Sequence, residues 1–533
     1  MKISICIKSY FNGFCHQFRL LILNPYMLVV ALYLCLNLTN LTLLPIFNDE
    51  AIYLDWSWFS IHVPGRLYDP LLDAKQPLMI WIFGVVGQFF EDPLFAGRFV
   101  SVLIGCFTLL GVYTLTRRVF DRHTALFASL LYAITPIFVF YNRQALMESA
   151  IACVGIWSGI ALLTLLRHPT TQNGIRLGII WGVGFFIKST TLVFLFASLL
   201  VVAWYYIHKK QTNISKPYLI SFATAVGVCS LLLINPVFWQ TFSSNNRYVY
   251  SLNEMFSLPL VSWVNHLVGF FGIGFIFITP VAFVVALIGI YRLRKGNADY
   301  KFVLLYFVTA LILEIVSVKS QSQRYLVAFL PFLMMPAAYV LAQLWKKTLF
   351  NKWIVCVTFL VSVLVSLLLI VNPAAYITTM SKVSQYAPKE YLFGQTAGYG
   401  INESLFYINQ HASANQQTLV MFGLGTGNPE NAIDLYSYRK PQLIPLHIDA
   451  TLFPGLNEYS CLTSRYPLFI VTRDRQLLGL ERYVSLVESF PNLDTSYAIR
   501  IYTLKKNCNG KTLILSDIYE SAIRKVIEMK HLK

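Results

Sequence analysis

The residues of this chain best suited to chemistry are ionisable side chains at the borders of long apolar segments. Asp49 and Glu50 directly follow one such segment, and Glu148 stands at the beginning of another. Lys75 and Lys188 also stand where apolar sequence gives way to polar sequence. Paired carboxylates can take a proton from a hydroxyl group or bind a metal ion, and lysine is a good point-charge partner for phosphate. These residue types indicate proton transfer near a bound phosphate.

The elements that must position these side chains follow from the composition. The chain has 533 residues, of which 56% are hydrophobic and 13% are charged, whereas soluble domains carry roughly 25% charged residues. A soluble protein has too little interior to hide that much apolar surface. The composition therefore predicts a polytopic α-helical membrane protein, and it excludes a cytosolic enzyme, a secreted domain and a disordered chain.

Apolar segments long enough to cross a membrane, roughly 20 residues each, recur along most of the chain. They lie at 25–46, 97–116, 124–141, 146–166, 175–187, 189–207, 217–238, 264–291, 302–318, 325–344 and 353–372. A further run at 76–90, QPLMIWIFGVVGQFF, is apolar but short. Because counting it as a span would invert every later segment, the loop charges must decide the topology.

The basic residues fall on one side of the membrane if 76–90 does not cross it. The N-terminus then shares the cytoplasmic side with five basic loops: Arg117, Arg118 and Arg122; Arg167 and Arg176; Lys209, Lys210 and Lys216; Arg292, Arg294, Lys295 and Lys301; and Lys346, Lys347 and Lys352. This is the arrangement that the positive-inside rule requires. We therefore expect about 11 spanning helices and a juxtamembrane or re-entrant helix at 76–90. The net charge of +17 then reflects topology and not a nucleic-acid partner.

Two regions are expected on the outer face, the first loop at 47–96 and the tail at 373–533. In the tail, TLVMFGLG and YPLFIVTRD have the pattern of short buried strands, and SDIYESAIRKVIEMK that of an amphipathic helix. The sequence therefore predicts a membrane domain at 1–372 and a small α/β domain at 373–533, outside the cytoplasm.

Cysteines and glycines of the tail carry weaker signals. Cys461 and Cys508 both lie there, so an oxidising compartment would permit a disulfide between them. The sequence GLGTG at 423–427 follows a predicted strand, and we interpret it as a tight turn because the dinucleotide-binding pattern is incomplete.

Charges of both signs are expected on the outer face, where charge at membrane depth is costly and usually functional. Besides the residues above, they are Asp55, Asp69, Asp73, Arg98, Arg143, Arg247, His266, Lys319 and Arg324. Structural roles stay open: an interfacial anchor for Arg98 or Lys319, solvated positions for Asp55 and Asp69, a salt bridge for Glu148, and a satisfied interface position for His266 in place of metal binding.

Together these residues indicate an outward-facing site at the depth of the lipid headgroups. It combines carboxylates with phosphate-binding cations, so a substrate with a lipid tail and a phosphate fits it. Chemistry outside the cytoplasm must bring its activated group on a carrier, and a polyprenyl phosphate is such a carrier.

Six motifs resemble those of the polyprenyl-phosphate-sugar-dependent glycosyltransferases of the GT-C fold, which include protein O-mannosyltransferases and bacterial aminoarabinose transferases. They occur in the family's order, as NDEAIY (48–53), LDAKQPL (72–78), AGRFVSVLIG (96–105), NRQALME (142–148), GFFIKS (184–189) and QRYLVAFLPF (323–332). The family also places juxtamembrane helices in the first outer loop, which agrees with the charge argument on 76–90.

The resemblance implies a role for each matching residue. Asp49 resembles the family's catalytic base, the residue that deprotonates the acceptor hydroxyl. Glu50 resembles the residue beside that base, which orients the acceptor or holds a metal. The other implied roles are a catalytic or site-shaping carboxylate for Glu148, donor-phosphate binding for Lys75, Lys188, Arg247, Arg324 and Tyr325, and site shaping for Arg98, Arg143 and Tyr53. A divalent metal would have Glu50 and His266 as candidate ligands. Such enzymes invert the anomeric carbon.

The sequence departs from the family at three places. Gln76 follows Lys75 where the family has proline, and Ala74 precedes Lys75 where aminoarabinose transferases have an acidic residue. Ile52 and Tyr53 stand where an arginine follows the acidic pair in those enzymes. We therefore expect a bacterial inner-membrane enzyme with a polyprenyl-phosphate-linked sugar donor. Its acceptor, a glycan, a lipid or a protein, stays open.

Two other functions remain as alternatives. A transporter or flippase of lipid-linked glycans also carries intramembrane charges and broken helices. The absence of a visible repeat, the large acidic outer loop and the gathering of charges at one face favour the enzyme. An inactive relative that serves as a scaffold is disfavoured by the retained Asp49, Glu50, Lys75 and Lys188.

Overall fold

The computed structural model describes residues 24–242, 248–412, 417–423, 427–440, 442–448, 467–473, 484–493 and 497–505. The chain forms two compact units. The first, here the helical unit, comprises Met1–Leu41, Val63–Val86 and Phe95–Ala387. The second, here the α/β unit, comprises Thr42–His62, Gly87–Leu94 and Pro388–Lys533. Two pieces of the first loop thus belong to the same unit as the tail.

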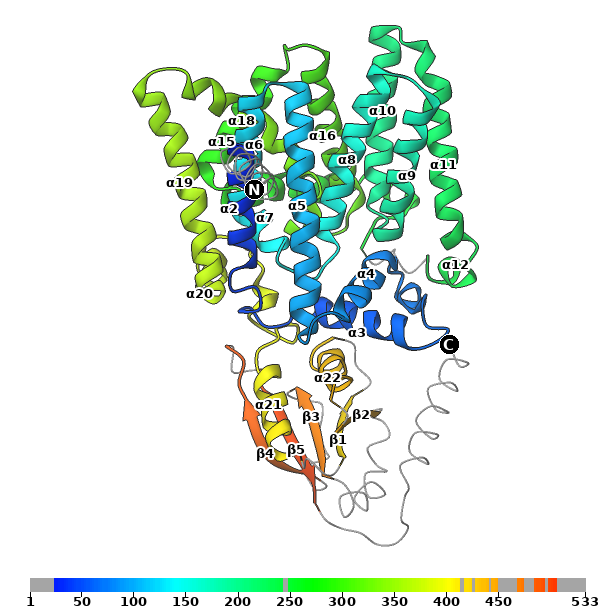
Figure 1. Ribbon diagram of the computed structural model, residues 1–533, viewed down its shortest axis with the longest axis vertical. Coiled ribbons are helices and arrows are strands. Elements are labelled where there is room, and N and C mark those ends of the chain that lie inside the picture. Colours follow the sequence, from blue (N-terminus) through cyan, green and yellow to red (C-terminus); the bar gives the residue numbers. More distant parts are fainter. Residues whose placement is uncertain are drawn as a thin grey trace, which may run out of the picture. The chain divides into compact units, whose positions relative to one another are not determined.

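The helical unit consists of roughly parallel helices joined by short loops (Figure 1). In chain order the helices up to its end are α2 (Pro25–Leu38), α4 (Leu78–Gly87), α5 (Pro93–Val119), α6 (Arg122–Ile134), α7 (Pro136–Tyr141), α8 (Glu148–Arg167), α9 (Thr171–Ile187), α10 (Thr191–Lys209), α11 (Ser215–Leu233), α12 (Pro236–Phe242), α13 (Leu252–Phe256), α14 (Leu260–Phe277), α15 (Pro280–Leu293), α16 (Ala298–Ser317), α17 (Gln323–Leu326), α18 (Leu330–Trp345), α19 (Leu349–Val371) and α20 (Pro373–Val383). The 3₁₀ turns η1 (Asp69–Asp73) and η2 (Thr212–Ile214) lie between them.

Seven of the described helices are long and apolar enough to cross a membrane, and further apolar helices are shorter. The predicted polytopic helical fold is therefore confirmed. Helix α4 falls in the ambiguous run 76–90 and has ten residues. At 1.5 Å per residue it is about 15 Å long, half of the roughly 30 Å hydrocarbon core. A straight helix of this length does not cross the membrane, in agreement with the charge argument.

Proline breaks two of the predicted spans. The segment predicted at 264–291 is two helices, α14 and α15, and the segment at 124–141 is α6 followed by α7. Thr279 and Thr135 stand at these breaks, each directly before a proline, and each has a ψ angle in the extended range, 142° and 128°. Proline lacks an N–H and disfavours a helical residue before it. The prediction of one continuous helix at each place is wrong for this reason.

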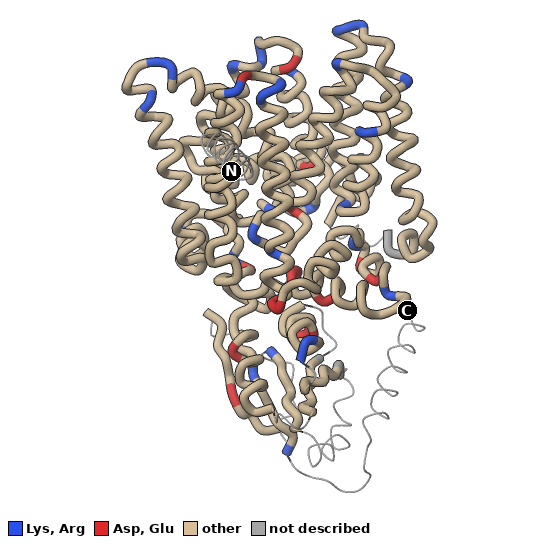
Figure 2. The backbone as a smooth tube through the Cα atoms, in the orientation of Figure 1, with Lys and Arg blue, Asp and Glu red and all other residues tan. Residues whose placement is uncertain are grey.

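Lysine and arginine residues gather in loops at one end of the helical unit (Figure 2). This is the grouping that the sequence predicts for the basic loops, and it agrees with the positive-inside rule.

Close packing of α9 on α11 fixes the position of the segment that follows α9. Gly174 and Gly178 stand one turn apart on α9, and a Cβ at either would collide with a backbone carbonyl of α11, that of Pro217 or that of Ser221. Small residues at this spacing let helix backbones approach closely in a membrane. Because α9 ends at Ile187, this packing also places Lys188, the next residue.

The α/β unit is built on a five-stranded sheet of order β2-β1-β3-β5-β4. Its strands are β1 (Thr418–Gly423), β2 (Leu443–Ile448), β3 (Leu468–Arg473), β4 (Val484–Phe490) and β5 (Ile499–Leu504), and its helices are α3 (Asn48–His62), α21 (Ile401–His411), α22 (Glu430–Ser437) and the turn η4 (Lys389–Tyr391). β1 pairs in parallel with β2 and β3, while β5 pairs antiparallel with β3 and β4.

The predicted strands TLVMFGLG and YPLFIVTRD correspond to β1 and β3, so the small α/β domain is confirmed as mixed sheet and helix. The predicted helix at 516–530 and the cysteines Cys461 and Cys508 lie outside the described residues.

The glycine contact between α9 and α11 gives a first test of the fold. We expect Gly178→Ala to lower the midpoint of thermal unfolding in detergent, since its Cβ would force the two backbones apart, and overpacking costs about 1–3 kcal/mol. Gly227→Ala on α11 is the matched control, because a Cβ there meets no atom within 4 Å. Equal midpoints for the two variants would contradict close packing at Gly178.

Candidate functional site

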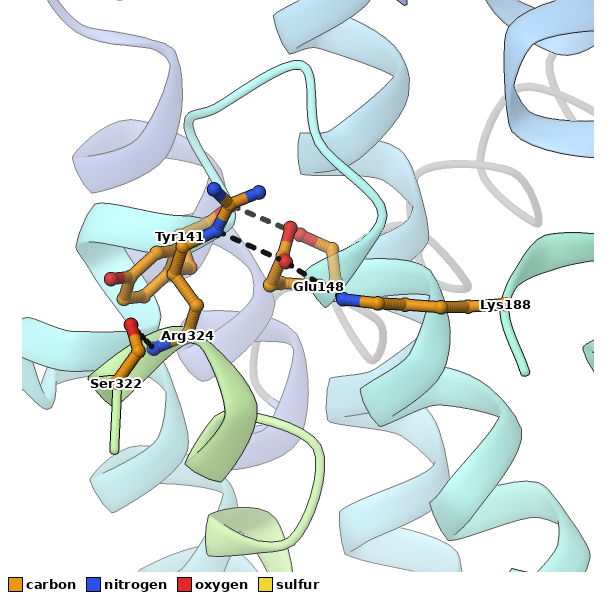
Figure 3. A network of polar contacts seen from close by, with 6 residues as sticks. Tyr141, Glu148, Lys188, Ser322 and Arg324 are labelled. Atoms are coloured by element: carbon orange, nitrogen blue, oxygen red, sulfur yellow. Dashed lines mark hydrogen bonds and ion pairs between the residues drawn. The ribbon is translucent and has the colours of Figure 1, made fainter. Parts of the chain in front are cut away.

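A carboxylate between two cations forms the centre of the candidate site in the helical unit (Figure 3). Oε1 of Glu148 accepts hydrogen bonds from Nζ of Lys188 and from Nε of Arg324, each at 3.2 Å. The Glu148 side chain is only 2% exposed, whereas those of Lys188 and Arg324 are 25% and 18% exposed. The anion is therefore buried, and both cations reach the surface, where a second anion can approach them.

Local structure explains how these side chains meet. Glu148 is the first residue of α8, and Lys188 is the extended residue that caps the C-terminus of α9. Arg324 lies in the single turn α17, where the Ser322 hydroxyl accepts a hydrogen bond from the Arg324 backbone N–H at 3.3 Å (Figure 3). Gln323 connects the same turn to the segment that follows α20, because its Nε2 donates to the carbonyl of Tyr386 at 2.6 Å.

Tyrosine rings lie beside the lysines of the site. Nζ of Lys188 is 5.7 Å from the centre of the Tyr325 ring, and Nζ of Lys75 is 5.5 Å from that of Tyr248. The two tyrosines also interact with each other electrostatically. Lys75 and the Tyr248 ring are thus linked to the Glu148 cluster through Tyr325.

Sequence reasoning missed one charged member of this cluster, Glu314. It is 4% exposed in α16 and interacts electrostatically with Lys188 and Tyr325. The signal was present in the sequence, because Glu314 interrupts the apolar stretch FVTALILEIVS, and an acidic residue inside a predicted span is a functional candidate. Tyr248 carried no comparable signal, since a tyrosine beside a membrane is common.

Arg98 and Arg143 bind backbone carbonyls at and beyond the C-terminal end of α2. Nη1 of Arg143 donates to the carbonyls of Leu36, Asn37 and Thr39, and Nη2 donates to that of Asn40, at 2.7–3.0 Å. Nη1 of Arg98 donates to the carbonyl of Leu41 at 2.9 Å. The last carbonyls of a helix lack partners within the helix, so these two arginines supply them. The sequence left a salt bridge of Glu148 as an alternative. Among the contacts of the described residues, Glu148 pairs with Lys188 and Arg324 and not with Arg143.

The remaining predicted residues of the helical unit have ordinary surroundings. His266 is buried, with Nδ1 3.0 Å from the carbonyl of Ile315, which is the satisfied interface position. Lys319 forms an ion pair with Glu254 at 2.7 Å, and this bond helps to lower the pKa of Glu254 to about 2. Asp69 forms an ion pair with Arg66 at 2.7 Å, with its side chain 23% exposed. Arg247 lies outside the described residues.

The acidic motif stands in the α/β unit, at the beginning of α3. Glu50 is buried, and its Oε2 accepts the backbone N–H of Phe47 at 3.0 Å, as in one half of a capping box. Asp49, in the same first turn, is partly exposed. Carboxylates in the first turn of a helix interact favourably with its dipole. Of the two, Asp49 is therefore the carboxylate with surface to offer to a substrate, and Glu50 shapes the turn.

Two neighbours of the acidic motif are buried as well. Tyr53 is 5% exposed and Asp55 is 2% exposed. Nδ2 of Asn431 donates to Oδ2 of Asp55 at 2.6 Å. The interpretation of Asp55 as a solvated loop residue is therefore wrong, because α3 is packed within its unit and not extended as a loop.

A metal site is not assembled within the described ranges. No three His, Cys, Asp or Glu side chains there are grouped closely enough to hold an ion. Glu50 already accepts the Phe47 N–H and His266 faces a carbonyl, so neither offers a prepared ligand set.

Comparison with known proteins gives a family match over part of the chain and a common fold. Residues 74–238 match the family described as Dolichyl-phosphate-mannose-protein mannosyltransferase, while no curated protein sequence matches. The structure is similar to that of ArnT from Cupriavidus metallidurans in the apo state, with a TM-score of 0.56 at 16% identity, over 91% of this chain and 99% of that one. ArnT bound to undecaprenyl phosphate gives 0.55 at 15% identity over the same shares.

A more distant similarity is to the Archaeoglobus fulgidus oligosaccharyltransferase in complex with Zn and sulfate. Its TM-score is 0.50 at 14% identity, over 91% of this chain and 73% of that one. At such identities a similarity of structure shows a common fold. The chain therefore shares the fold of these membrane proteins, and the family match at residues 74–238 agrees with the resemblance drawn from the six motifs.

Proposed function

We propose that this protein transfers a sugar from a polyprenyl-phosphate donor, such as an undecaprenyl-phosphate sugar, to an acceptor hydroxyl at the outer face of a bacterial inner membrane. In this proposal the N-terminus is cytoplasmic, and the tail lies outside the cytoplasm. The acceptor is a glycan, a lipid or a protein.

The contact of Glu148 with Lys188 and Arg324 is the observation that carries the proposal. In this contact, one carboxylate oxygen accepts hydrogen bonds from two cations that reach the surface. A phosphate oxygen is also an anionic acceptor and can bind the same two donors. Lys75, with Tyr248 beside it, and Tyr325 extend this surface. The undecaprenyl phosphate bound to the similar ArnT supports a donor of this class.

The proposed reaction is a single displacement. Asp49 accepts the proton of the acceptor hydroxyl as its oxygen attacks the anomeric carbon on the face opposite the phosphate. The bond from the anomeric carbon to the phosphate oxygen breaks, and its electron pair leaves with the polyprenyl phosphate. Lys75, Lys188 and Arg324 stabilise the charge that develops on this leaving group, an electrostatic contribution that is usually the largest in catalysis.

The buried carboxylates and arginines have supporting roles in this scheme. Glu148 holds Lys188 and Arg324 in place before the donor arrives, and Glu314 lies within electrostatic reach of Lys188. Arg98 and Arg143 fix the chain that follows α2, which leads directly to the acidic motif in the sequence.

The role of Asp49 gives the first functional prediction. With purified protein in lipid nanodiscs, a panel of radiolabelled polyprenyl-phosphate sugars and a membrane extract as acceptor, we expect Asp49→Asn to reduce transfer about 10²–10⁴-fold, the usual contribution of a general base. Asp69→Asn is the matched control, since Asp69 forms a surface pair with Arg66. It should transfer as the wild type does.

Other outcomes of this assay would change the assignment. Equal transfer by wild type and Asp49→Asn would remove Asp49 as the base. No release of polyprenyl phosphate from any donor by the wild type would contradict the transferase, and a lipid-flipping assay in liposomes would then test the transporter.

The cation pair gives a second prediction, measured by binding alone. Glu148→Gln removes the buried anion, and breaking a buried ion pair costs about 3–5 kcal/mol, so we expect a lower thermal midpoint in detergent. Added undecaprenyl phosphate should raise that midpoint more than it raises the wild-type midpoint, because the phosphate supplies the missing charge and binding stabilises the folded state.

Two lysine variants complete this experiment. Lys188→Met should abolish the stabilisation by undecaprenyl phosphate, and Lys382→Met, at an exposed position in the last turn of α20, should retain it. Equal stabilisation of all four proteins would show that the lipid phosphate binds elsewhere.

A further inference from the structure

The sheet of the α/β unit has a topological switch point between β1 and β3. From β1 the chain continues through α22 to β2 on one side of β1, and it later forms β3 on the other side (Figure 1). In open α/β sheets, ligands bind outside the carboxyl ends of the strands at such a point. Here these ends are Gly423 and Arg473.

In this protein, other segments of the same chain contact the carboxyl end of β3, where a ligand would bind. Arg473, 3% exposed, donates from Nε to the carbonyl of Asn428 at 3.4 Å and from Nη2 to that of Ala397. Burial lowers the pKa of Arg473 to about 10, and Glu430 opposes this shift. Arg473 thus binds the two segments, around Ala397 and Asn428, that contact the first loop.

Asn428 connects the sheet to the residues that precede Asp49. Its backbone N–H donates to Oδ1 of Asn48 at 2.9 Å, and its Nδ2 donates to the carbonyls of Ile46 and Thr396 at 3.0 and 3.1 Å. The N–H of Asn48 in turn donates to the carbonyl of Thr396 at 3.0 Å. The first residue of α3 is therefore held on both its backbone and its side chain.

The approach of the two segments is close enough to require a glycine. Gly427 has a φ of +101°, a value that L side chains rarely adopt, and a Cβ there would collide with the Asn48 amide. Gly427, the last residue of the predicted tight turn, thus contacts the acidic motif where related sheets would contact a ligand, and residues 424–426 of that turn lie outside the described part of the chain.

Further contacts fix the two pieces of the first loop in this unit to the two residues that follow α22. Trp58 of α3 stacks on Tyr438 at 4.1 Å between ring centres. Arg439 donates to the carbonyls of Gly87, Phe90 and Glu91. Both pieces of the first loop in this unit are therefore bound by the tail.

We propose that the tail sheet positions the base: its switch point binds the first loop in place of a ligand, and Asn428 is the positioning residue that orients Asp49. This inference rests on the proposed function, in which Asp49 accepts the proton. A general base must lie within hydrogen-bond reach of the proton that it takes, and small displacements of a reacting group cost large factors in rate. A helix end fixed to a sheet meets this demand better than a free loop.

The test compares two buried asparagines of the α/β unit. Asn428→Asp keeps the shape, but its carboxylate oxygen faces the carbonyls of Ile46 and Thr396 and donates no hydrogen bond. We expect kcat to fall roughly 10²-fold, with KM for the polyprenyl-phosphate sugar unchanged. Asn492→Asp is the matched control, because Asn492 is 4% exposed and donates only within the tail, to the carbonyl of Gly394. It should keep both constants.

A double-mutant cycle separates positioning from general damage. If Asn428 acts through Asp49, Asn428→Asp should lower transfer no further in an Asp49→Asn background. A full additional loss, or an equal loss of kcat in Asn492→Asp, would overturn the inference and indicate a structural role. Unchanged kcat in Asn428→Asp would overturn it too, while leaving the role of Asp49 intact. An active Asp49→Asn single variant would instead overturn the proposed base.

Discussion

A carboxylate buried in a membrane protein must be paired, and the pairing of Glu148 organises the helical unit. An unpaired charge in such surroundings costs several kcal/mol, so Glu148 is stable only with Lys188 and Arg324 beside it. These residues come from the beginning of α8, the end of α9 and the turn α17, which are distant in the sequence. The requirement to neutralise one anion therefore brings three helix ends together. The glycine-mediated packing of α9 on α11 then has a functional consequence, because it sets where Lys188 emerges.

The same demand for satisfied polar groups explains the other conspicuous charges. The last carbonyls of helix α2 have no partners within the helix, and Arg143 and Arg98 supply donors to them and to the carbonyls that follow. In the α/β unit, Asn428 and Arg473 do the same for the carbonyls of Ile46 and Ala397. Charged and amide side chains that look catalytic by type thus divide into two groups. Some reach the surface, as Lys188 does, and others donate their hydrogen bonds to backbone carbonyls.

Sequence patterns predicted the elements well where a local signal determined them. Apolar runs and loop charges gave the helical fold, and the shortness of 76–90 was matched by α4. The break between α14 and α15 was also readable from Pro280, yet the continuous apolar run concealed it. The contacts were not predictable in this way. Asn428 and Arg439 are ordinary polar residues until the fold brings them to Asn48 and Gly87, 380 and 352 positions away. The solvated position considered for Asp55 was wrong for the same reason, because no nearby residue in the sequence indicates its hydrogen bond with Asn431.

In the proposed reaction, the carboxylate between the cations would also affect turnover. Two cations fixed side by side would repel each other and would bind a departing lipid phosphate very tightly. With Glu148 between them they are oriented in advance, which is what electrostatic stabilisation of a leaving group requires. In that scheme the same anion would compete with phosphate for Lys188 and Arg324, and so would weaken the binding of substrate and product alike. Since uniform binding does not accelerate the chemical step, and release of a product often limits turnover, a site of this kind gains more from a competing carboxylate than from tighter binding.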